Sequence, residues 1–503
     1  MEFSMNEEKQ AKSIQISNKA MLVSTILVAL VLIGSIILTL VMKPGTIETA
    51  ADGSINLLPG ENNMTWWKYV LSPFIVLTPF YENFATVWSI VLLCIVIGAV
   101  FNAMDASGIL VYMVETLARR FGDKKYKMLF VLALVMMLLG TVLGISEEVI
   151  PLVPLAVMLF YAFGWDSPLA IMASDLAACA GFTVGVINPF NTGLAQSLSD
   201  EVPMYSGILF RIVLFILFFS VLWFWLRRYA KRLDKNPMRS CTYKEDQARK
   251  EGFDFQIDSL KKDPVKDRGL KWFIIVIGVC IALALCNISI STILSKAAEK
   301  GGPNAETFES VSSALSGSIL YMIILGYTVA GIGACIRCGL KEKALLKTLN
   351  KGILTLLPAA GMILLASAIG YIFGESGISD TIVYYAADTM GSSSGFVCVL
   401  LLMLFLFILE IFIPSASGKA FLIMPLAYRL CTVLGIDHQL AVLSFLFADG
   451  FANSMLPSNY GLLITLGMTP VSYPKWIKTA GSVFLSFFVL AIGALAFGYF
   501  VLY

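Results

Sequence analysis

Residues 397–434 form two short apolar runs that are separated by a polar break. The first run, 397–413, carries one charged residue, Glu410, and is followed by Pro414-Ser415-Ala416-Ser417-Gly418-Lys419. Apolar sequence then resumes over 420–434. An arm of about 15 residues, at 1.5 Å per residue, is too short to cross a hydrocarbon layer about 30 Å thick. The pattern therefore predicts a re-entrant hairpin near 397–434 and not two spans.

The next apolar segment, 438–466, is long enough to span but is interrupted by Asn453-Ser454-Met455-Leu456-Pro457-Ser458-Asn459-Tyr460-Gly461. Non-helical backbone at membrane depth persists only where protein buries it or where it lines a wet cavity. We therefore predict a broken helix over 438–466 and a binding site near the middle of the membrane.

The same two features occur earlier in the chain, which indicates an internal repeat. A hairpin is predicted near 128–163, and a broken helix is predicted over 167–197, with its interruption at Asn188-Pro189-Phe190-Asn191-Thr192-Gly193. A shift of 269 residues (450 minus 181) places Gly181-Phe182 on Gly450-Phe451. One shift that aligns both the hairpins and the broken helices of the two halves supports an internal repeat.

The composition is that of a helical membrane protein. Hydrophobic residues make up 58% of the 503 residues and charged residues only 14%, whereas a membrane β-barrel would alternate polar and apolar residues. The net charge of +2 gives no indication of nucleic-acid binding. The nine cysteines are scattered, and His438 is the only histidine, so the common catalytic sets cannot be assembled. We expect neither an enzyme nor a bound cofactor.

Basic residues predict the orientation of the segments. Residues 1–20 form a tail with three lysines ahead of the first span, and residues 227–271 form a linker with 14 Lys or Arg against 8 Asp or Glu. Both are predicted to be cytoplasmic. The segment 107–127 contains five basic residues, whereas its counterpart in the repeat, 376–394, contains none. Matching segments on opposite sides of the membrane would make the repeat inverted.

These features predict an all-α polytopic protein of the cell membrane with an inverted repeat, two re-entrant hairpins and two broken helices. Its halves are 21–226 and 272–503, with about nine full spans in all. The N-terminus is expected inside and the C-terminus outside. Secondary transporters with inverted repeats bind their substrates where the broken helices meet.

Polar side chains at the tips and breaks are candidate substrate ligands. The N-terminus of a half-helix offers free N–H groups and a positive dipole end to a carboxylate, and hydroxyl and amide groups add donors or Na⁺ ligands. A Na⁺ ion would lie near Asn188 and Asn453. The alternative is that Asn-Pro and Pro-Ser-Asn only terminate helices. The candidate substrate-binding residues are Ser146, Glu147, Glu148, Asn188, Asn191, Thr192, Ser415, Ser417, Lys419, Asn453, Ser458 and Asn459.

Charged residues inside spans are costly and usually face a cavity or a partner. Asp175, Glu410 and Asp449 are candidates for a coupling or charge network, and internal pairing of Lys419 with Glu410 or Asp449 is the alternative to a direct role in binding.

The adjacent carboxylates of Glu147 and Glu148 repel each other, so at least one is expected to bind a substrate amine or another cation or to take up a proton. The alternative is that one of them pairs with Lys419.

The motifs resemble those of the anaerobic dicarboxylate-carrier family, the DcuC/YfcC-like proteins of the ion-transporter superfamily, over residues 21–502. The resemblance implies a secondary carrier of small carboxylates or amino acids, some members being regarded as arginine–ornithine antiporters. It also implies a transport domain that moves against a scaffold, and often a homodimer. The superfamily's Ser-Asn-Thr tips are replaced here, so its sodium and carboxylate ligands are not carried over. The motifs are Gly144-Ile145-Ser146-Glu147-Glu148 with Pro151, Asn188-Pro189-Phe190, Pro414-Ser415-Ala416-Ser417-Gly418-Lys419 and Asp449-Gly450-Phe451.

The function predicted is secondary active transport, with elevator-like alternating access, of a small cationic or zwitterionic amino acid such as arginine or ornithine. The alternative is a carrier of small di- or monocarboxylates coupled to Na⁺ or H⁺, the cation neutralising the glutamates. A channel is disfavoured by the paired discontinuous hairpins. The expected partners are the substrate, the lipid bilayer and a second copy of the chain, and not nucleic acid.

Overall fold

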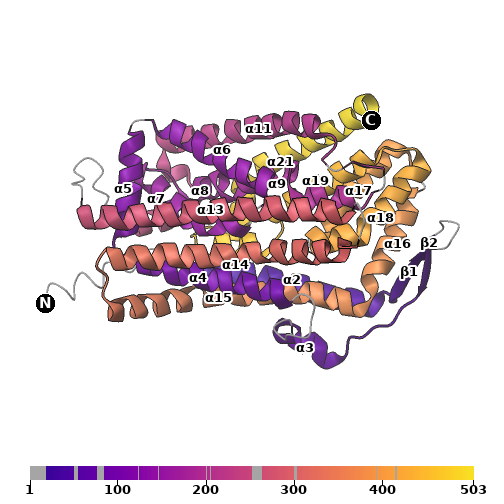
Figure 1. The fold of residues 1–503 in the computed structure, drawn as a ribbon, viewed down its shortest axis with the longest axis horizontal. Helices are drawn as coiled ribbons and strands as arrows, with labels where there is room; N and C mark the ends of the chain where they lie inside the picture. The colour runs from indigo at the N-terminus through magenta and orange to yellow at the C-terminus, as the bar shows by residue number, and fades with distance from the viewer. Residues whose placement is uncertain are drawn as a thin grey trace.

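The helices form one elongated bundle (Figure 1). The computed structural model describes residues 18–49, 55–75, 84–122, 124–144, 147–199, 201–203, 205–251, 263–299, 303–391, 393–413 and 416–503. Within these ranges the only strands are β1 (Gly45–Thr49) and β2 (Ile55–Pro59), an antiparallel pair in which Gly45 lies opposite Pro59. The prediction of an all-α polytopic protein is therefore confirmed.

The first half contains ten α-helices and two short helices of other types, in the ranges that the structure describes. Their bounds are α2 (Asn18–Val41), α3 (Trp66–Ile75), α4 (Phe84–Ala106), α5 (Ile109–Phe121), α6 (Lys125–Leu143), the 3-10 helix η1 (Glu147–Leu152), α7 (Val153–Ala162), α8 (Ser167–Ala173), α9 (Asp175–Val184), the π-helix η2 (Pro189–Gly193), α10 (Leu194–Ser197) and α11 (Ile208–Lys235).

Two short helices of the linker precede the second half. The bounds here are η3 (Pro237–Arg239), α12 (Tyr243–Lys250), α13 (Pro264–Glu299), α14 (Ala305–Arg337), α15 (Glu342–Ser376), α16 (Ile378–Gly391), α17 (Gly395–Leu409), α18 (Ala416–Leu434), α19 (His438–Met455), α20 (Tyr460–Gly467), α21 (Tyr473–Phe497) and η4 (Gly498–Leu502).

In the described ranges, six helices are long and apolar enough to cross a membrane, or up to eight if each of two bent helix pairs is one span. The sequence predicted about nine spans. The count covers only the described residues, so it does not test the predicted number of spans for the whole chain.

Both predicted hairpins have a helix–break–helix layout, α6–η1–α7 and α17–α18. Three of the four arms contain only short apolar stretches, whereas α6 is long enough to span. The tips at 145–146 and 414–415 lie outside the described residues. The re-entrant path of the two hairpins therefore stays a prediction.

Glycines bring the broken helices into backbone contact with their neighbours. A Cβ added to Gly181 of α9 would lie 2.0 Å from the backbone oxygen of Met137 on α6. A Cβ on Gly450 of α19 would lie 2.4 Å from the Cα of Thr183 on α9. Because any larger residue would push these backbones apart, glycine is required at both positions. Helix α9 is thus fixed to the first hairpin on one side and to α19 on the other.

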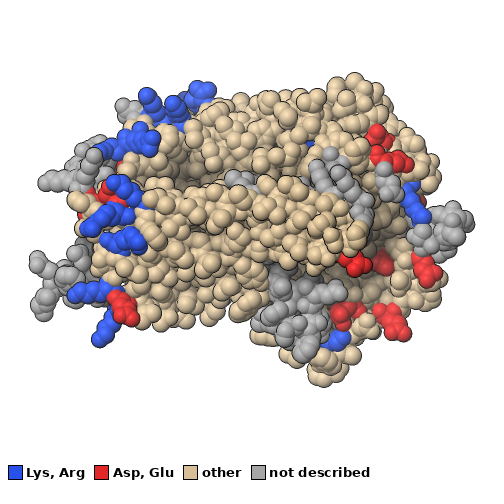
Figure 2. Space-filling view, in the orientation of Figure 1, with Lys and Arg blue, Asp and Glu red and all other residues tan. Residues whose placement is uncertain are grey.

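The two amphipathic connections lie at opposite ends of the bundle. Figure 1 shows α5 at one end and α16 at the other. Figure 2 shows that most of the visible Lys and Arg side chains gather at the end with α5, and that Asp and Glu gather at the end with α16. Loops with an excess of Lys and Arg stay in the cytoplasm, so this charge asymmetry predicts which end faces inward.

The described part of the linker packs against both halves. Helix α11 continues to Lys235 and α13 begins at Pro264, so both ends of the expected 227–271 linker are helical extensions. On α12 the buried carboxylate of Asp246 accepts hydrogen bonds from the hydroxyls of Tyr161 and Ser167, both at 2.6 Å. Lys475 of the second half forms an ion pair with Glu245 on the same helix, at 2.6 Å. Helix α12 therefore bridges the repeats.

The opposite placement of α5 and α16 can be tested by labelling. Arg120 and Asp388 are exposed near the ends of these helices. Arg120→Cys and Asp388→Cys, introduced singly into a cysteine-free background, should react with a membrane-impermeant maleimide from opposite sides of the membrane. Labelling of both cysteines from one side would rule out the inverted orientation.

Candidate functional site

The first break follows α9, where side chains replace the lost helical hydrogen bonds. Gly185 adopts a positive φ of 51° that ends the helix. The Asn191 amide nitrogen donates to the Phe182 carbonyl at 2.9 Å, and the Thr192 hydroxyl donates to the Gly185 carbonyl at 2.5 Å. The Asn188 side-chain oxygen accepts from the Asn191 backbone N–H at 3.3 Å. These contacts give Asn191 and Thr192 a structural role at the break, whether or not they also touch substrate.

The second break separates α19 from α20 and is stabilised by a different set of side chains. Asn459 caps α20, since its side-chain oxygen accepts from the Leu462 backbone N–H at 2.9 Å. Its amide nitrogen donates to the Asn453 side-chain oxygen at 2.8 Å. The Ser458 hydroxyl donates to the Glu410 carbonyl at 3.4 Å. The break is thereby joined to the end of α17, the first arm of the second hairpin.

A buried charge cluster lies beside this break. The Lys419 ammonium, in the first turn of α18, lies 2.8 Å from a carboxylate oxygen of Asp449 on α19 and also contacts the Glu410 carboxylate. The three side chains are each only 1% exposed. The second Asp449 oxygen and the Oε1 atom of Glu410 accept no hydrogen bond from the described residues. Two carboxylates around one ammonium leave a negative charge to be balanced, by a proton or by a cation.

The two breaks do not lie at the same level along the crossing helices. Gly450 lies against Thr183, and Gly185 lies within reach of Leu446, so α9 and α19 run antiparallel. With Gly185 opposite Leu446, the end of α19 at Met455 is nine residues, about 14 Å, further along the axis. The charge cluster is closer to the crossing, because Asp449 is adjacent to Gly450.

Each hairpin reaches the broken helix of the other half. The 3-10 helix η1, at the first tip, packs against α20, and α18 of the second hairpin packs against η2. The breaks and hairpins of the two repeats are therefore interleaved at the core of the bundle.

The structure describes only some of the predicted site residues. Asn188, Asn191, Thr192, Asn453, Ser458 and Asn459 are buried at the breaks, Glu410, Lys419 and Asp449 form the charge cluster, and Asp175 is buried in the first turn of α9. Ser146 and Ser415 lie outside the described residues, as do the side chains of Glu147, Glu148 and Ser417. The proposal that the two tips bind opposite ends of a substrate is therefore not tested here.

Pairing of Lys419 with Glu410 and Asp449, which the sequence offered as an alternative to direct binding, is found. In this conformation the ammonium pairs with two carboxylates of its own half, and it belongs with the charge network rather than with an open carboxylate site. Within the described side chains, no three His, Cys, Asp or Glu residues converge to hold a metal ion. A Na⁺ ion near Asn188 and Asn453 stays a prediction.

Sequence reasoning missed three side chains beside the breaks. Arg211 of α11 is 1% exposed and donates to the Tyr205 carbonyl at 3.2 Å and, weakly, to the Val186 carbonyl at 3.4 Å. From α21, Tyr473 donates to the Met455 carbonyl at 2.8 Å and Trp476 to the Ser454 carbonyl at 2.9 Å. A lone arginine in an apolar run was a usable signal for Arg211. The two aromatic donors carried no signal, because such residues are common at membrane interfaces.

Helices that break in the core of a polytopic bundle, next to buried charges, are typical of membrane transporters. Residues 20–499 match the family model for DcuC, described as the C4-dicarboxylate anaerobic carrier. The chain therefore belongs to this family of multi-pass membrane transporters.

Two relatives share 24% identity with the chain. One, from Escherichia coli (strain K12), bears the description "Putative basic amino acid antiporter YfcC" and aligns over 432 residues, 83% of this chain and 79% of its own length. The other is an uncharacterised protein of Haemophilus influenzae, aligned over 386 residues, 76% of this chain and 70% of its own length. In a comparison of structures, the crystal structure of the Alcanivorax borkumensis YdaH transporter has 16% identity and a TM-score of 0.45, covering 95% of this chain and 99% of that one.

Removing the lysine of the charge cluster should destabilise the protein strongly. Lys419→Met leaves two buried carboxylates without their cation, and breaking a buried pair in this way costs about 3–5 kcal/mol. The midpoint of thermal unfolding in detergent should therefore fall well below that of the wild type. Lys343→Met, at an exposed lysine, should leave the midpoint unchanged.

The triple variant Lys419→Met, Glu410→Gln, Asp449→Asn should recover much of the lost stability, since it removes the unbalanced charges together. If Lys419→Met alone unfolds at the wild-type temperature, the cluster is not the charged unit described above.

Proposed function

We propose that the chain is a secondary active transporter of a small amino acid, with a preference for cationic or zwitterionic substrates such as arginine or ornithine. The main support is the charge cluster, in which Glu410 and Asp449 together outnumber the ammonium of Lys419. Because a net charge at membrane depth is costly, the cluster favours a cation at some stage of the cycle. That cation is a coupling H⁺ or Na⁺ or the cationic group of the substrate, in exchange or in cotransport.

The relative described as a basic amino acid antiporter supports the same preference. The second candidate is a carrier of C4-dicarboxylates or monocarboxylates coupled to Na⁺ or H⁺, which the description of the family favours. A dianion would bring two further negative charges toward a cluster whose lysine is already paired. It would therefore need more coupling cations than an amino acid.

Glu147 and Glu148 are the proposed contacts for the substrate amine. They begin η1, which packs against α20, the helix that follows the second break. The proposed contacts for the substrate carboxylate are the hydroxyls of Ser415 and Ser417 and the start of α18. The amides at the breaks complete the site in this proposal.

The substrate proposal can be tested in proteoliposomes. Wild-type protein should show saturable counterflow, which a channel does not. Glu147→Gln and Glu148→Gln should each reduce the preference for arginine over succinate by about tenfold, corresponding to the loss of about 1.4 kcal/mol of binding free energy. Glu309→Gln, at an exposed glutamate on α14, is the matched control and should keep the wild-type preference. Wild-type preferences in both tip variants would exclude selection by these carboxylates.

We propose an elevator-like motion for the transport cycle, with the basic end of the bundle in the cytoplasm and the C-terminus outside. Each hairpin packs on the broken helix of its own half, α6 on α9 and α17 on α19, and the two broken helices pack on each other. These elements form a connected unit that can move as one body. Helices α11 and α21 pack against each other beside this unit and are assigned to the scaffold.

Cross-linking between the moving unit and the scaffold should block transport. The rings of Phe451 on α19 and Phe488 on α21 lie 4.7 Å apart. Phe451→Cys with Phe488→Cys, joined by a short bifunctional thiol reagent in a cysteine-free background, should lose nearly all transport activity.

The control pair lies within the scaffold, where the rings of Phe210 on α11 and Phe497 on α21 lie 5.8 Å apart. Phe210→Cys with Phe497→Cys should stay active after the same treatment. Full activity of the cross-linked Phe451/Phe488 pair would exclude displacement of α19 relative to α21.

A further inference from the structure

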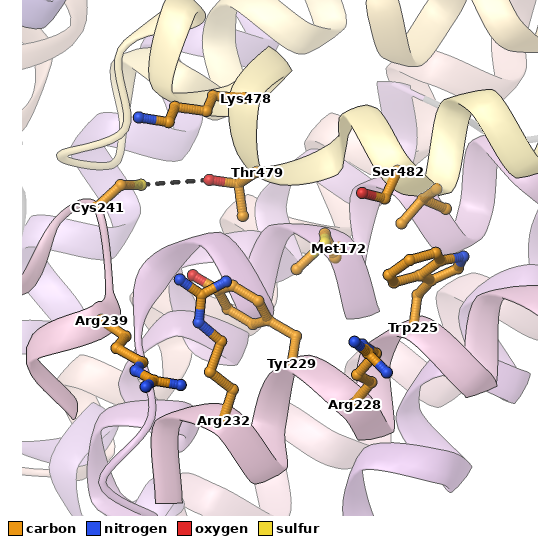
Figure 3. Close-up of a pocket in the computed structure, with 11 residues that line it drawn as sticks. Met172, Trp225, Arg228, Tyr229, Arg232, Arg239, Cys241, Lys478, Thr479 and Ser482 are labelled. Atoms are coloured by element: carbon orange, nitrogen blue, oxygen red, sulfur yellow. Dashed lines mark hydrogen bonds between the residues drawn. The ribbon is translucent and has the colours of Figure 1, made fainter. Parts of the chain in front are cut away.

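A cavity whose lining does not include the Lys419 cluster lies at the basic end of the bundle. It has a volume of about 320 Å³ and lies between α11 and α21, beside η3 of the linker. Figure 3 shows the side chains of both helices and of the linker surrounding it. The lining residues are Met172, Trp225, Arg228, Tyr229, Arg232, Arg239, Cys241, Lys478, Thr479, Ser482 and Val483.

The charged residues of this lining are all basic. Arg228 and Arg232 lie one turn apart on α11, Arg239 comes from η3, and Lys478 comes from the first turns of α21. In the part of the chain that the structure describes, none of the four is within 4.0 Å of a carboxylate. Four positive charges around one small volume, without countercharge in that part, create a site for an anion.

The buried carboxylate of Asp166, which contacts the lining residue Tyr229, is engaged by donors of the protein. Asp166 lies behind Tyr229, accepting a hydrogen bond from the Tyr229 hydroxyl at 2.8 Å, and it caps α8 through the Leu169 backbone N–H at 3.0 Å. Burial, with the negative charge of Asp246 adding to it, raises the pKa of the Asp166 carboxyl to about 6. The Asp166 carboxylate is therefore already engaged by these two donors.

The chemistry of the lining fits a phosphate group. Guanidinium groups bind phosphate through paired N–H donors, and the Ser482 hydroxyl is directed toward the cavity (Figure 3). Outside the cavity the same two helices expose apolar side chains, since Phe224 of α11 is 57% exposed and Leu485 of α21 is 67% exposed. Trp225 adds the aromatic anchor found at membrane interfaces. Basic pockets between transmembrane helices on the cytoplasmic side bind anionic headgroups.

We propose that this cavity binds the phosphate group of an anionic phospholipid, whose acyl chains lie along the exposed apolar faces of α11 and α21. The lipid phosphate joins the linker to the scaffold, because Arg239 approaches from η3 and the other three cations from α11 and α21. A free phosphate ion would offer the basic residues the same phosphate group. It would bind more weakly than the lipid, because it has no acyl chains to bury against the apolar faces of α11 and α21.

The test uses the full-length protein in a neutral detergent, with dioctanoyl phosphatidylglycerol, dioctanoyl phosphatidylcholine and inorganic phosphate as probes. Phosphatidylglycerol should raise the midpoint of thermal unfolding and form a retained adduct in native mass spectrometry, whereas phosphatidylcholine should do neither. Inorganic phosphate should act only at far higher concentration. If inorganic phosphate and phosphatidylglycerol act equally at the same concentration, the bound phosphate group does not come from a lipid.

The double variant Arg232→Gln, Arg239→Gln should bind phosphatidylglycerol at least about tenfold more weakly, a change of about 1.4 kcal/mol. Arg120→Gln with Lys124→Gln removes two charges at the same end of the bundle but outside the cavity, and should bind as the wild type does. Without lipid, all variants should unfold at the wild-type temperature. Should the first double variant fail to fold, the single variant Lys478→Gln replaces it. If the cavity variant and the control variant lose the same affinity for phosphatidylglycerol, or if neither loses any, the cavity is not the lipid-binding site.

Discussion

Every backbone group that a helix releases inside a membrane must find a partner within the protein, and this constraint governs the core of the bundle. Each break frees N–H and C=O groups where water is scarce. At the first break, partners come from the break itself, through Asn191 and Thr192. At the second, Asn459 caps the following helix, and the last carbonyls of α19 are bonded by Tyr473 and Trp476 of α21. The two repeats thus meet one requirement in different ways.

The same residues explain why Asn, Ser and Thr at the breaks cannot be read directly as substrate ligands. An amide that bonds a freed carbonyl has fewer donors left for a ligand. The charge cluster is different, because the Oε1 atom of Glu410 and one Asp449 oxygen accept no hydrogen bond from the described residues. These carboxylate oxygens therefore retain the capacity to bind a proton or a cation.

Much of the fold could be predicted from segment lengths alone. Apolar arms that are too short to span, and breaks within longer runs, predicted the helix–break–helix layout of residues 128–163 and 397–434 and the interruptions after α9 and α19. The re-entrant path of the two hairpins stays a prediction. The pairing of Lys419 was also foreseeable, since a lysine in an apolar run needs an acidic partner. The docking of α12 could not be predicted, because Asp246 sits in a strongly polar stretch and its partners Tyr161 and Ser167 are about 80 residues away. Nor does the sequence reveal that Arg211 reaches a break on another helix, since that depends on how α11 packs.

The contacts at Gly181 and Gly450 have a mechanical consequence. Elsewhere in a protein, a layer of side chains separates neighbouring helices, and rotamer changes in that layer absorb small displacements. Between α6, α9 and α19 the backbones touch directly at these glycines, so that layer is missing there. A shift of α9 at these points must pass to its neighbours undiminished, or the contact must open. Near these glycines the three helices are expected to move together as one rigid group. Any change of packing that the transport cycle needs must then occur at other contacts of α6, α9 and α19.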